Sequence, residues 1–313
     1  MTKIAFVFPG QGSQSVGMLD GFAGNAAVAD VVARASAALG EDLAGLMANG
    51  PAEKLNLTTH TQPVMLTAGV AAYAAWQAAG GPAPAVVAGH SLGEYAALVA
   101  AGALTLEDAV RLVRIRADAM QSAVPVGAGG MAAILGLSDD QVREVCAASA
   151  QSEVVEAVNF NAPAQVVIAG HKAAVERACE AAKQAGAKRA LPLPVSAPFH
   201  SSLMQPAADT LAKALEAIDI QSPRVPVLNN VDVAAPTEPA AISDALVRQA
   251  WHPVRWVETI QTMQAKGITH VVECGPGKVL TGLTKRIAPG LTALAVTDEA
   301  SLKAALEAVA GGA

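Results

Sequence analysis

Cysteine is scarce in this 313-residue sequence, and the three cysteines lie far apart without CxxC spacing. Cys146, Cys179 and Cys274 each fall within an apolar, periodic stretch, which indicates buried thiols. This pattern excludes a disulfide framework and disfavours a structural metal site. We therefore expect a reducing compartment and no bound metal.

Long apolar runs and an excess of basic charge are also missing. No run approaches the ~20 apolar residues of a membrane span, and the amino-terminal MTKIAFVFPG lacks the length and cleavage site of a signal peptide. Only 15% of the residues are charged, 52% are hydrophobic, and the formal net charge is −6. These values describe a compact globule and give no reason to expect nucleic acid or a membrane as partner. We expect a cytoplasmic enzyme that is a monomer.

Short apolar runs alternate with longer helical patterns, which predicts an α/β fold with a parallel sheet. The predicted strands are 3–8, 85–89, 226–230, 270–275 and 292–296. The predicted helices are 62–79, 92–101, 106–122, 202–217, 242–250 and 255–265. Thr105, with Asp108 three residues later, has the spacing of an amino-terminal helix cap.

The middle of the chain has a different order of elements, strand-helix-strand-strand-helix-strand, which is typical of a ferredoxin-like domain. These elements are predicted at 131–137, 138–150, 154–160, 165–170, 172–186 and 188–195. We predict an α/β-hydrolase-like large domain, 1–126 and 197–313, with a ferredoxin-like domain, 127–196, inserted into it. A cleft between the two is where a substrate is expected.

One serine stands in a turn that is typical of nucleophiles. In GHSLG, Ser91 lies between Gly89 and Gly93, after the apolar AVVAG and before the helical EYAALVAA. Such glycines allow a sharp strand-to-helix turn that exposes Oγ and points the next amide, here that of Leu92, at an oxyanion. We interpret Ser91 as a nucleophile; a serine that only caps a helix is the alternative.

A serine nucleophile needs a base, and the sequence has six histidines. His90 adjoins Ser91, but a sharp turn should aim its side chain away from Oγ. His200 is the best single candidate, because its loop, VSAPFHSSLM, brings the chain back to the cleft. Packing roles are more common for histidines within or beside regular elements, which here are His60, His171, His252 and His270.

The loop FPGQGSQSVG, at 8–17, follows the first predicted strand. It lacks the Gly-Lys-Ser/Thr of a phosphate loop and the glycine spacing of a dinucleotide fingerprint. At the carboxyl end of a strand it can offer backbone N–H groups to the cleft. Gln11 fits the need for a second oxyanion donor; a simple tight turn is the alternative.

Arg116 lies near Val113 and Met120 on the apolar side of its predicted helix, so we expect it to be buried. A buried arginine needs an anionic partner, and a guanidinium binds a carboxylate through two parallel hydrogen bonds. That partner is either a carboxylate of the substrate or an internal salt bridge.

These residues together resemble the malonyl-CoA:acyl carrier protein transacylases, members of the acyltransferase family of bacterial fatty acid and polyketide synthesis. The similarity covers nearly the whole chain. Its motifs are FPGQGSQ at 8–14, TQPVMLTAGVA at 61–71, GHSLGEY at 89–95, Arg116, NFNAPAQVVIAG at 159–170, FHSSLM at 199–204 and ECGPGKVL at 273–280. The fold that it implies, a large α/β domain with a ferredoxin-like insertion, agrees with the order of predicted elements.

The resemblance implies a two-step exchange that needs no cofactor. Ser91 takes malonyl from malonyl-CoA, and the phosphopantetheine thiol of acyl carrier protein then attacks the malonyl ester. His200 serves as base and acid, and the main-chain carbonyl of Gln249 orients it. The amides of Gln11 and Leu92 are the implied oxyanion donors.

The resemblance also implies an acyl pocket. Arg116 would bind the malonyl carboxylate, and Gln11, Met120 and Asn161 are further implied substrate-binding residues. Phe199 resembles the residue of malonyl-selective polyketide acyltransferases, where a bulky ring leaves little room for an α-methyl group. Dedicated bacterial transacylases often have a small residue there, so the pathway stays open.

Two other functions stay open on the sequence alone. A serine esterase or thioesterase shares GxSxG and a histidine, but it needs an acid between them in chain order, and nearly all such acids here fall in the inserted domain. An inactive carrier-protein scaffold is disfavoured because the motif residues are intact. Docking of an acidic carrier protein would need a basic patch, for which the candidates are Lys188, Arg189, Lys278, Lys285 and Arg286.

Overall fold

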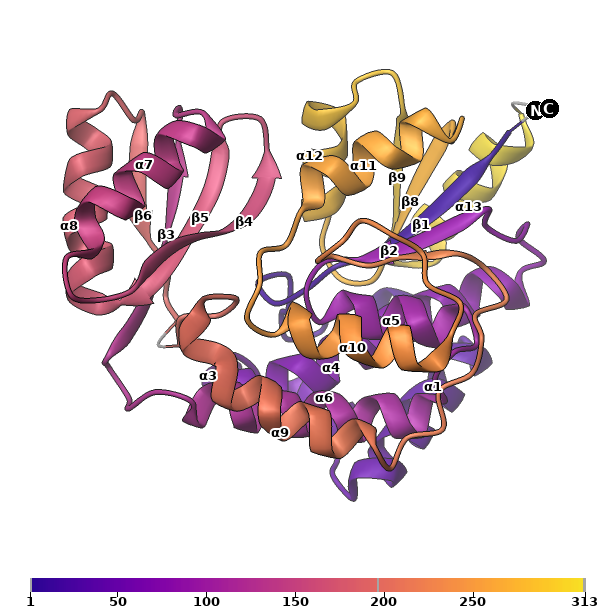
Figure 1. Ribbon diagram of the computed structural model, residues 1–313. Helices are drawn as coiled ribbons and strands as arrows, with labels where there is room; N and C mark the ends of the chain where they lie inside the picture. The colour runs from indigo at the N-terminus through magenta and orange to yellow at the C-terminus, as the bar shows by residue number, and fades with distance from the viewer. Residues whose placement is uncertain (1, 196, 312–313) are drawn as a thin grey trace.

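Two β-sheets organise the fold (Figure 1). The computed structural model describes residues 2–195 and 197–311. Five parallel strands form the larger sheet in the order β7-β2-β1-β8-β9. They are β1 (Ile4–Phe8), β2 (Val86–Gly89), β7 (Val227–Leu228), β8 (His270–Cys274) and β9 (Thr292–Val296). The predicted α/β fold with a parallel sheet is confirmed.

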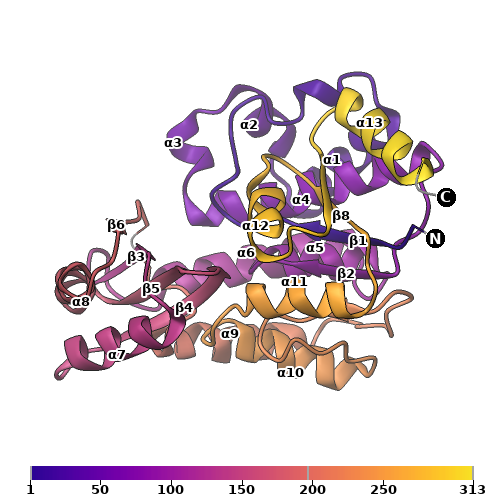
Figure 2. The same cartoon turned by 90° about the horizontal axis from the view of Figure 1, so that it is seen from above.

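Helices cover both faces of the parallel sheet, and Figure 2 shows α1 and α11 on opposite sides of its strands. Alternate residues of β1 point to the two faces: Phe6 and Phe8 join one apolar core, and Ala5 and Val7 join the other. The helices are α1 (Ala26–Leu39), α2 (Leu43–Asn49), α3 (Ala52–Leu55), α4 (Thr58–Ala78), α5 (Gly93–Ala100), α6 (Leu106–Ser122), α9 (Gln205–Leu215), α10 (Pro239–Gln249), α11 (Trp256–Ala265), α12 (Val279–Ile287) and α13 (Glu299–Ala310), with short 3₁₀ turns η1 (Asp20–Phe22) and η2 (Ser202–Met204). None of the helices in the described ranges is long and apolar enough to cross a bilayer.

The smaller sheet is antiparallel and has the strand order β4-β5-β3-β6. Its strands are β3 (Gly129–Leu135), β4 (Val155–Ala162), β5 (Gln165–His171) and β6 (Arg189–Pro192). Helices α7 (Asp139–Ala150) and α8 (Lys172–Gln184) share an apolar core with this sheet. The element order is the one predicted from the sequence, and we propose that 127–196 is a separate domain; the predicted boundaries at 1, 196 and 313 lie outside the described residues.

Strand β4 also contacts two chain segments outside the smaller sheet. The N–H of Phe160 donates to the carbonyl of Val254 at 3.0 Å, and the N–H of Val254 donates to the carbonyl of Val158 at 2.8 Å. The carboxylate of Glu156 accepts the N–H and the hydroxyl of Ser202, each at 2.8 Å. One strand of the smaller sheet thus holds both the loop that follows His200 and the segment that follows Gln249.

Candidate active site

Ser91 lies in a sharp turn between the end of β2 and the start of α5. Its backbone has a φ of 53°, which L-residues rarely adopt. A Cβ on Gly89 would lie 1.9 Å from the carbonyl carbon of Gly93, and a Cβ on Gly93 would lie 2.1 Å from the oxygen of Phe8, so both flanking glycines are required. The Oδ1 atom of Asn230 accepts the Ser91 N–H at 2.7 Å and holds the turn.

His200 is the partner of the serine hydroxyl. Its Nε2 atom lies 2.7 Å from Ser91 Oγ, and its Nδ1 atom lies 2.8 Å from the carbonyl oxygen of Gln249. Because a carbonyl oxygen only accepts, Nδ1 carries the proton and Nε2 is free to accept the Ser91 proton. Burial lowers the pKa of His200 to about 3, and the positive charge of Arg116 adds to this lowering, so the imidazole is neutral at pH 7.

Arg116 lies in the same site and is only 2% exposed. Its Nη1 donates to Gln62 Oε1 at 2.7 Å, and its Nη2 donates to Ser91 Oγ at 3.1 Å and to Gln249 Oε1 at 3.0 Å. All three acceptors are uncharged, so the internal salt bridge weighed from the sequence does not form in the described part of the chain. A guanidinium beside the serine can therefore receive an external anion.

A small cavity of about 120 Å³ opens at Ser91, which suits a short acyl group rather than a long chain. Both sheets contribute to its walls, as expected for a site between them. Of the residues singled out in the sequence, those that line it are Gln11, Ser91, Leu92, Arg116, Met120, Phe199 and His200. The remaining lining residues are Gln62, His90, Met131, Asn159, Leu193 and Val195.

Asn161 lies outside this lining. Its Oδ1 atom bonds with His90 Nε2 at 2.7 Å, which also explains why the His90 ring is not the partner of the Ser91 hydroxyl. The cavity is instead lined by Asn159, two residues earlier on β4, whose buried Oδ1 atom has no hydrogen-bond partner among the described residues. Side chains of a strand alternate between its faces, but the β4–β5 pairing has a register shift near this point, so no sequence pattern distinguishes Asn159 from Asn161.

The main-chain N–H groups of Gln11 and Leu92 have no acceptor within residues 2–195 and 197–311. Both residues border the cavity beside Ser91. Donors that are left open next to a nucleophile are what an oxyanion requires.

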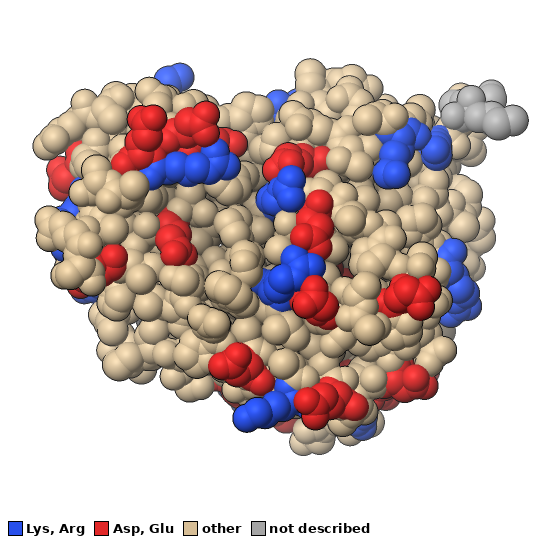
Figure 3. Space-filling view, viewed as in Figure 1, with Lys and Arg blue, Asp and Glu red and all other residues tan. Residues whose placement is uncertain are grey.

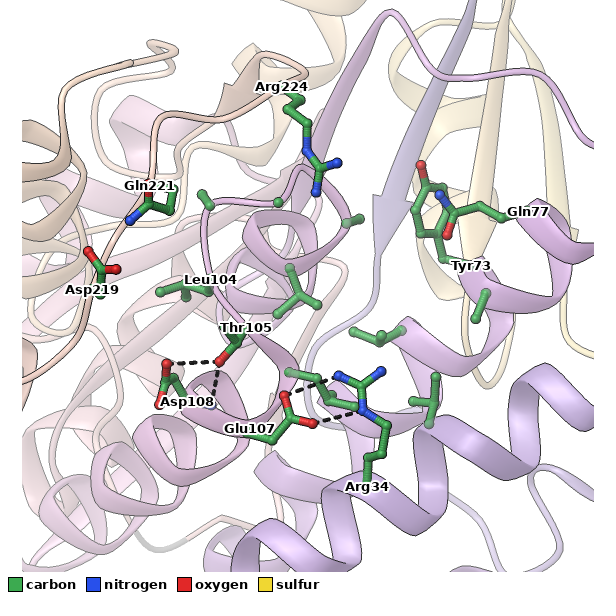
Figure 4. A pocket seen from close by; sticks show the side chains of 18 residues that line it. Arg34, Tyr73, Gln77, Leu104, Thr105, Glu107, Asp108, Asp219, Gln221 and Arg224 are labelled. Carbon is green, nitrogen blue, oxygen red and sulfur yellow. Dashed lines mark hydrogen bonds and ion pairs between the residues drawn. The ribbon is translucent and has the colours of Figure 1, made fainter.

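A larger hollow, of about 600 Å³, lies among α1, α4 and the start of α6 (Figure 4). Several of its polar groups bond to one another: Arg34 Nε donates to Glu107 Oε1 at 2.8 Å, and the Thr105 hydroxyl donates to Asp108 Oδ2 at 2.8 Å. Among the described residues, its lining holds neither a serine nor a histidine, so it lacks the serine–histidine pair found in the smaller cavity.

Comparison with known proteins identifies the family. The sequence profile of the family described as "Acyl transferase domain" matches residues 5–299. The chain belongs to the acyl transferase family. The malonyl CoA-acyl carrier protein transacylase of Salmonella typhimurium is 59% identical to this acyl transferase over 307 residues, which are 98% of this chain and 99% of that protein.

Solved structures agree with this assignment. The crystal structure of an acyl-carrier-protein S-malonyltransferase from Burkholderia pseudomallei is 65% identical to this acyl transferase, with a TM-score of 0.97 over 98% of this chain and 100% of that chain. A complex of a type II polyketide synthase acyl-carrier protein with its malonyl-transacylase gives 53% identity and a TM-score of 0.97 over 98% of this chain and 100% of that chain.

Several residues of the acyl transferase site were missed from the sequence. Gln62 holds Arg116, Asn230 holds the serine turn, and Glu94 accepts the N–H of Asn230 at 2.9 Å. Gln62 lies in the family motif at 61–71 and Glu94 in the motif at 89–95, and these motifs were the only sequence signal that pointed to them.

Proposed function

We propose that this chain transfers a malonyl group from malonyl-CoA to the phosphopantetheine thiol of acyl carrier protein, through an ester on Ser91. One observation carries the proposal: a buried Arg116 guanidinium, hydrogen-bonded only to uncharged groups, lies 3.1 Å from Ser91 Oγ. A carboxylate on the acyl group is the anion that this position can bind. The names of the relatives support the same substrate and acceptor.

In the first step, Ser91 Oγ attacks the thioester carbonyl carbon while His200 Nε2 takes the hydroxyl proton. The amides of Gln11 and Leu92 donate to the oxyanion that forms. The C–S bond then breaks, the malonyl group stays on Oγ, and His200 returns the proton to the sulfur of CoA.

Substrate binding makes His200 a better base. Part of the lowering of its pKa comes from the positive charge of Arg116. A malonyl carboxylate on Arg116 compensates that charge, so the pKa of His200 rises when the substrate is in place.

In the second step a thiol is the nucleophile, whereas in the first step the CoA thiol is the leaving group. His200 takes the proton from the phosphopantetheine thiol, the sulfur attacks the ester carbonyl, and the C–O bond to Ser91 breaks. The proton then returns to Ser91 Oγ. Each step uses only main-chain and side-chain groups of the enzyme together with its two substrates, so we expect no cofactor.

The other predicted site residues shape the pocket in this account. Met120 and Phe199 form apolar walls beside the acyl group, and the ring of Phe199 limits the room for an α-methyl group. Asn161 acts through His90, whose ring it holds. Gln249 orients His200 through its carbonyl and Arg116 through its side chain.

The esterase hypothesis is disfavoured by the group that orients the histidine. A Ser-His-acid triad places a carboxylate on the Nδ1 of the histidine, whereas here Nδ1 faces the carbonyl of Gln249. A polyketide pathway remains a second destination for the malonyl group, because a relative in complex with a type II polyketide synthase carrier protein has the same fold. We place the enzyme in the cytoplasm, since its three free cysteines are buried thiols that fit a reducing compartment.

The fate of the malonyl group tests the proposal. The enzyme is incubated with malonyl-CoA, with and without phosphopantetheinylated acyl carrier protein, and both malonyl-carrier protein and free malonate are measured. We expect malonyl to appear on the carrier protein, with only slow release of malonate when the carrier is omitted. Fast release of malonate with no transfer would establish a hydrolase instead.

A further inference from the structure

A buried carboxyl group lies behind the residues that line the acyl pocket. Glu94, the second residue of α5, is 2% exposed and takes no part in the exchange described above. Its Oε2 atom accepts the N–H of Asn230 at 2.9 Å and the Nε2–H of Gln249 at 3.0 Å. Both donors are neutral groups, so neither forms an ion pair with the Glu94 carboxylate.

Gln249 links this carboxyl to the groups that bind substrate. Its Nε2 also donates to the carbonyl of Ser91 at 2.9 Å, and its Oε1 accepts from Arg116 Nη2 at 3.0 Å. One amide therefore joins Glu94 to the guanidinium that faces the acyl group. A negative charge on Glu94 acts on the same arginine as a substrate carboxylate does.

The charge of Glu94 changes near neutral pH. Burial raises its pKa to about 7, against the opposing effects of its hydrogen bonds and of Arg116. The ionisable groups that face it are Arg116 on α6, Asp232 after β7 and Tyr95 beside it on α5. Arg116 is the only cation among them, so an ionised Glu94 cancels part of the attraction of Arg116 for a second carboxylate in the pocket.

We propose that Glu94 is a positioning residue that sets how strongly the enzyme prefers an acyl group bearing a carboxylate. It does so through Gln249, which it shares with Arg116. When Glu94 is protonated, Arg116 is free to attract the malonyl carboxylate; when Glu94 is ionised, part of that attraction is cancelled. Acetyl has no carboxylate and is insensitive to this charge. The inference rests on the proposed function and names a determinant of its selectivity.

The test is the ratio of malonyl to acetyl loading on Ser91, measured in single turnovers at several pH values below and above 7. The ratio cancels titrations that both acyl groups share, and comparison with a Glu94 variant separates the titration of Glu94 from that of His200, whose pKa also responds to the charge of Arg116. In the wild type we expect it to fall by on the order of tenfold as pH rises through 7, the effect of one pKa unit of charge interaction. In Glu94→Gln, whose amide oxygen can still accept both hydrogen bonds, we expect a ratio that stays high at every pH.

Glu273→Gln is the matched control. Glu273 on β8 is also fully buried, and its donors are the N–H of Leu280 at 3.1 Å and the N–H and hydroxyl of Thr281, each at 2.7 Å. This variant also replaces a buried carboxyl with an amide, at a residue whose partners given above do not include Arg116 or Gln249, so its ratio should follow that of the wild type.

Two results would overturn the inference: a Glu94→Gln ratio with the pH dependence of the wild type, or equal losses of malonyl and acetyl loading, which would mean that Glu94 is only structural. Failure of the proposed function looks different, because the wild type itself would then form no malonyl ester on Ser91.

Discussion

Two residues of the candidate site have backbone conformations that side chains usually avoid. Ser91 has a φ of 53° and His200 a φ of 65°. Their surroundings hold both: Asn230 accepts the N–H of Ser91, and the carbonyl of Gln249 fixes the His200 ring. With these backbone conformations, Ser91 Oγ and His200 Nε2 lie 2.7 Å apart. The proposed nucleophile and base are therefore within hydrogen-bonding distance of each other.

Arg116 carries the selectivity of the proposed exchange, and its removal is a direct prediction. In Arg116→Ala the malonyl carboxylate loses its charged hydrogen bonds, so malonyl loading should fall on the order of 100-fold more than acetyl loading. Single-turnover loading with both thioesters measures this difference.

The control is Arg111→Ala, because Arg111 lies on the same helix with 52% of its side chain exposed and should leave both rates unchanged. Equal loss for the two acyl groups in Arg116→Ala would argue against a carboxylate clamp.

Residues whose roles depend on local pattern could be foreseen, and those that depend on distant contacts could not. The glycine spacing around Ser91 and the position of His200 in a loop pointed to the pair now seen 2.7 Å apart. Asn230 acts on Ser91 across 139 residues of sequence, and no periodicity encodes such a contact. Asn161 shows the same limit, since a register shift in β4 decides which asparagine lines the cavity.

Secondary-structure elements were foreseen where caps and periodicity agreed. The predicted helix 106–122 matches α6, and the Thr105 hydroxyl accepts the N–H of Asp108 at 3.1 Å as its spacing predicted. Strand β7 is shorter than the predicted 226–230, because the N–H of Asn229 donates to the carbonyl of Ala234 and the N–H of Asn230 donates to Glu94. Helices α1, α2, α3, α12 and α13 were not predicted, which reflects their short or alanine-rich patterns.

The cap of α6 gives a prediction about stability. Thr105→Ala leaves a first-turn N–H without its acceptor and should lower the free energy of unfolding by about 1 kcal/mol. Urea denaturation measures the change, and Thr105→Ser, which keeps the hydroxyl, serves as control. Malonyl loading should stay the same in both variants, because Thr105 borders a different hollow from Ser91. A Thr105→Ala midpoint equal to that of the wild type would show that the cap contributes nothing.

In the whole molecule, the site exists only where the two sheets meet. The Ser91 turn follows β2 of the parallel sheet, and Met131 and Asn159 come from the antiparallel sheet. Glu156 ties the smaller sheet to Ser202, two residues beyond His200. On the face seen in Figure 3, acidic and basic side chains are interspersed rather than gathered by sign. The carrier-protein surface suggested from the sequence stays a prediction.

The most direct measurement is a two-step chase on the intact enzyme. Wild type and Ser91→Ala are reacted with malonyl-CoA, freed of CoA by rapid gel filtration, and analysed by peptide mass spectrometry; acyl carrier protein is then added to the loaded enzyme. We expect one malonyl ester, on the Ser91 peptide, that is absent from Ser91→Ala and moves to the phosphopantetheine thiol. A malonyl adduct that persists in Ser91→Ala, or a loaded enzyme that does not pass its malonyl group to the carrier, would contradict the proposed exchange.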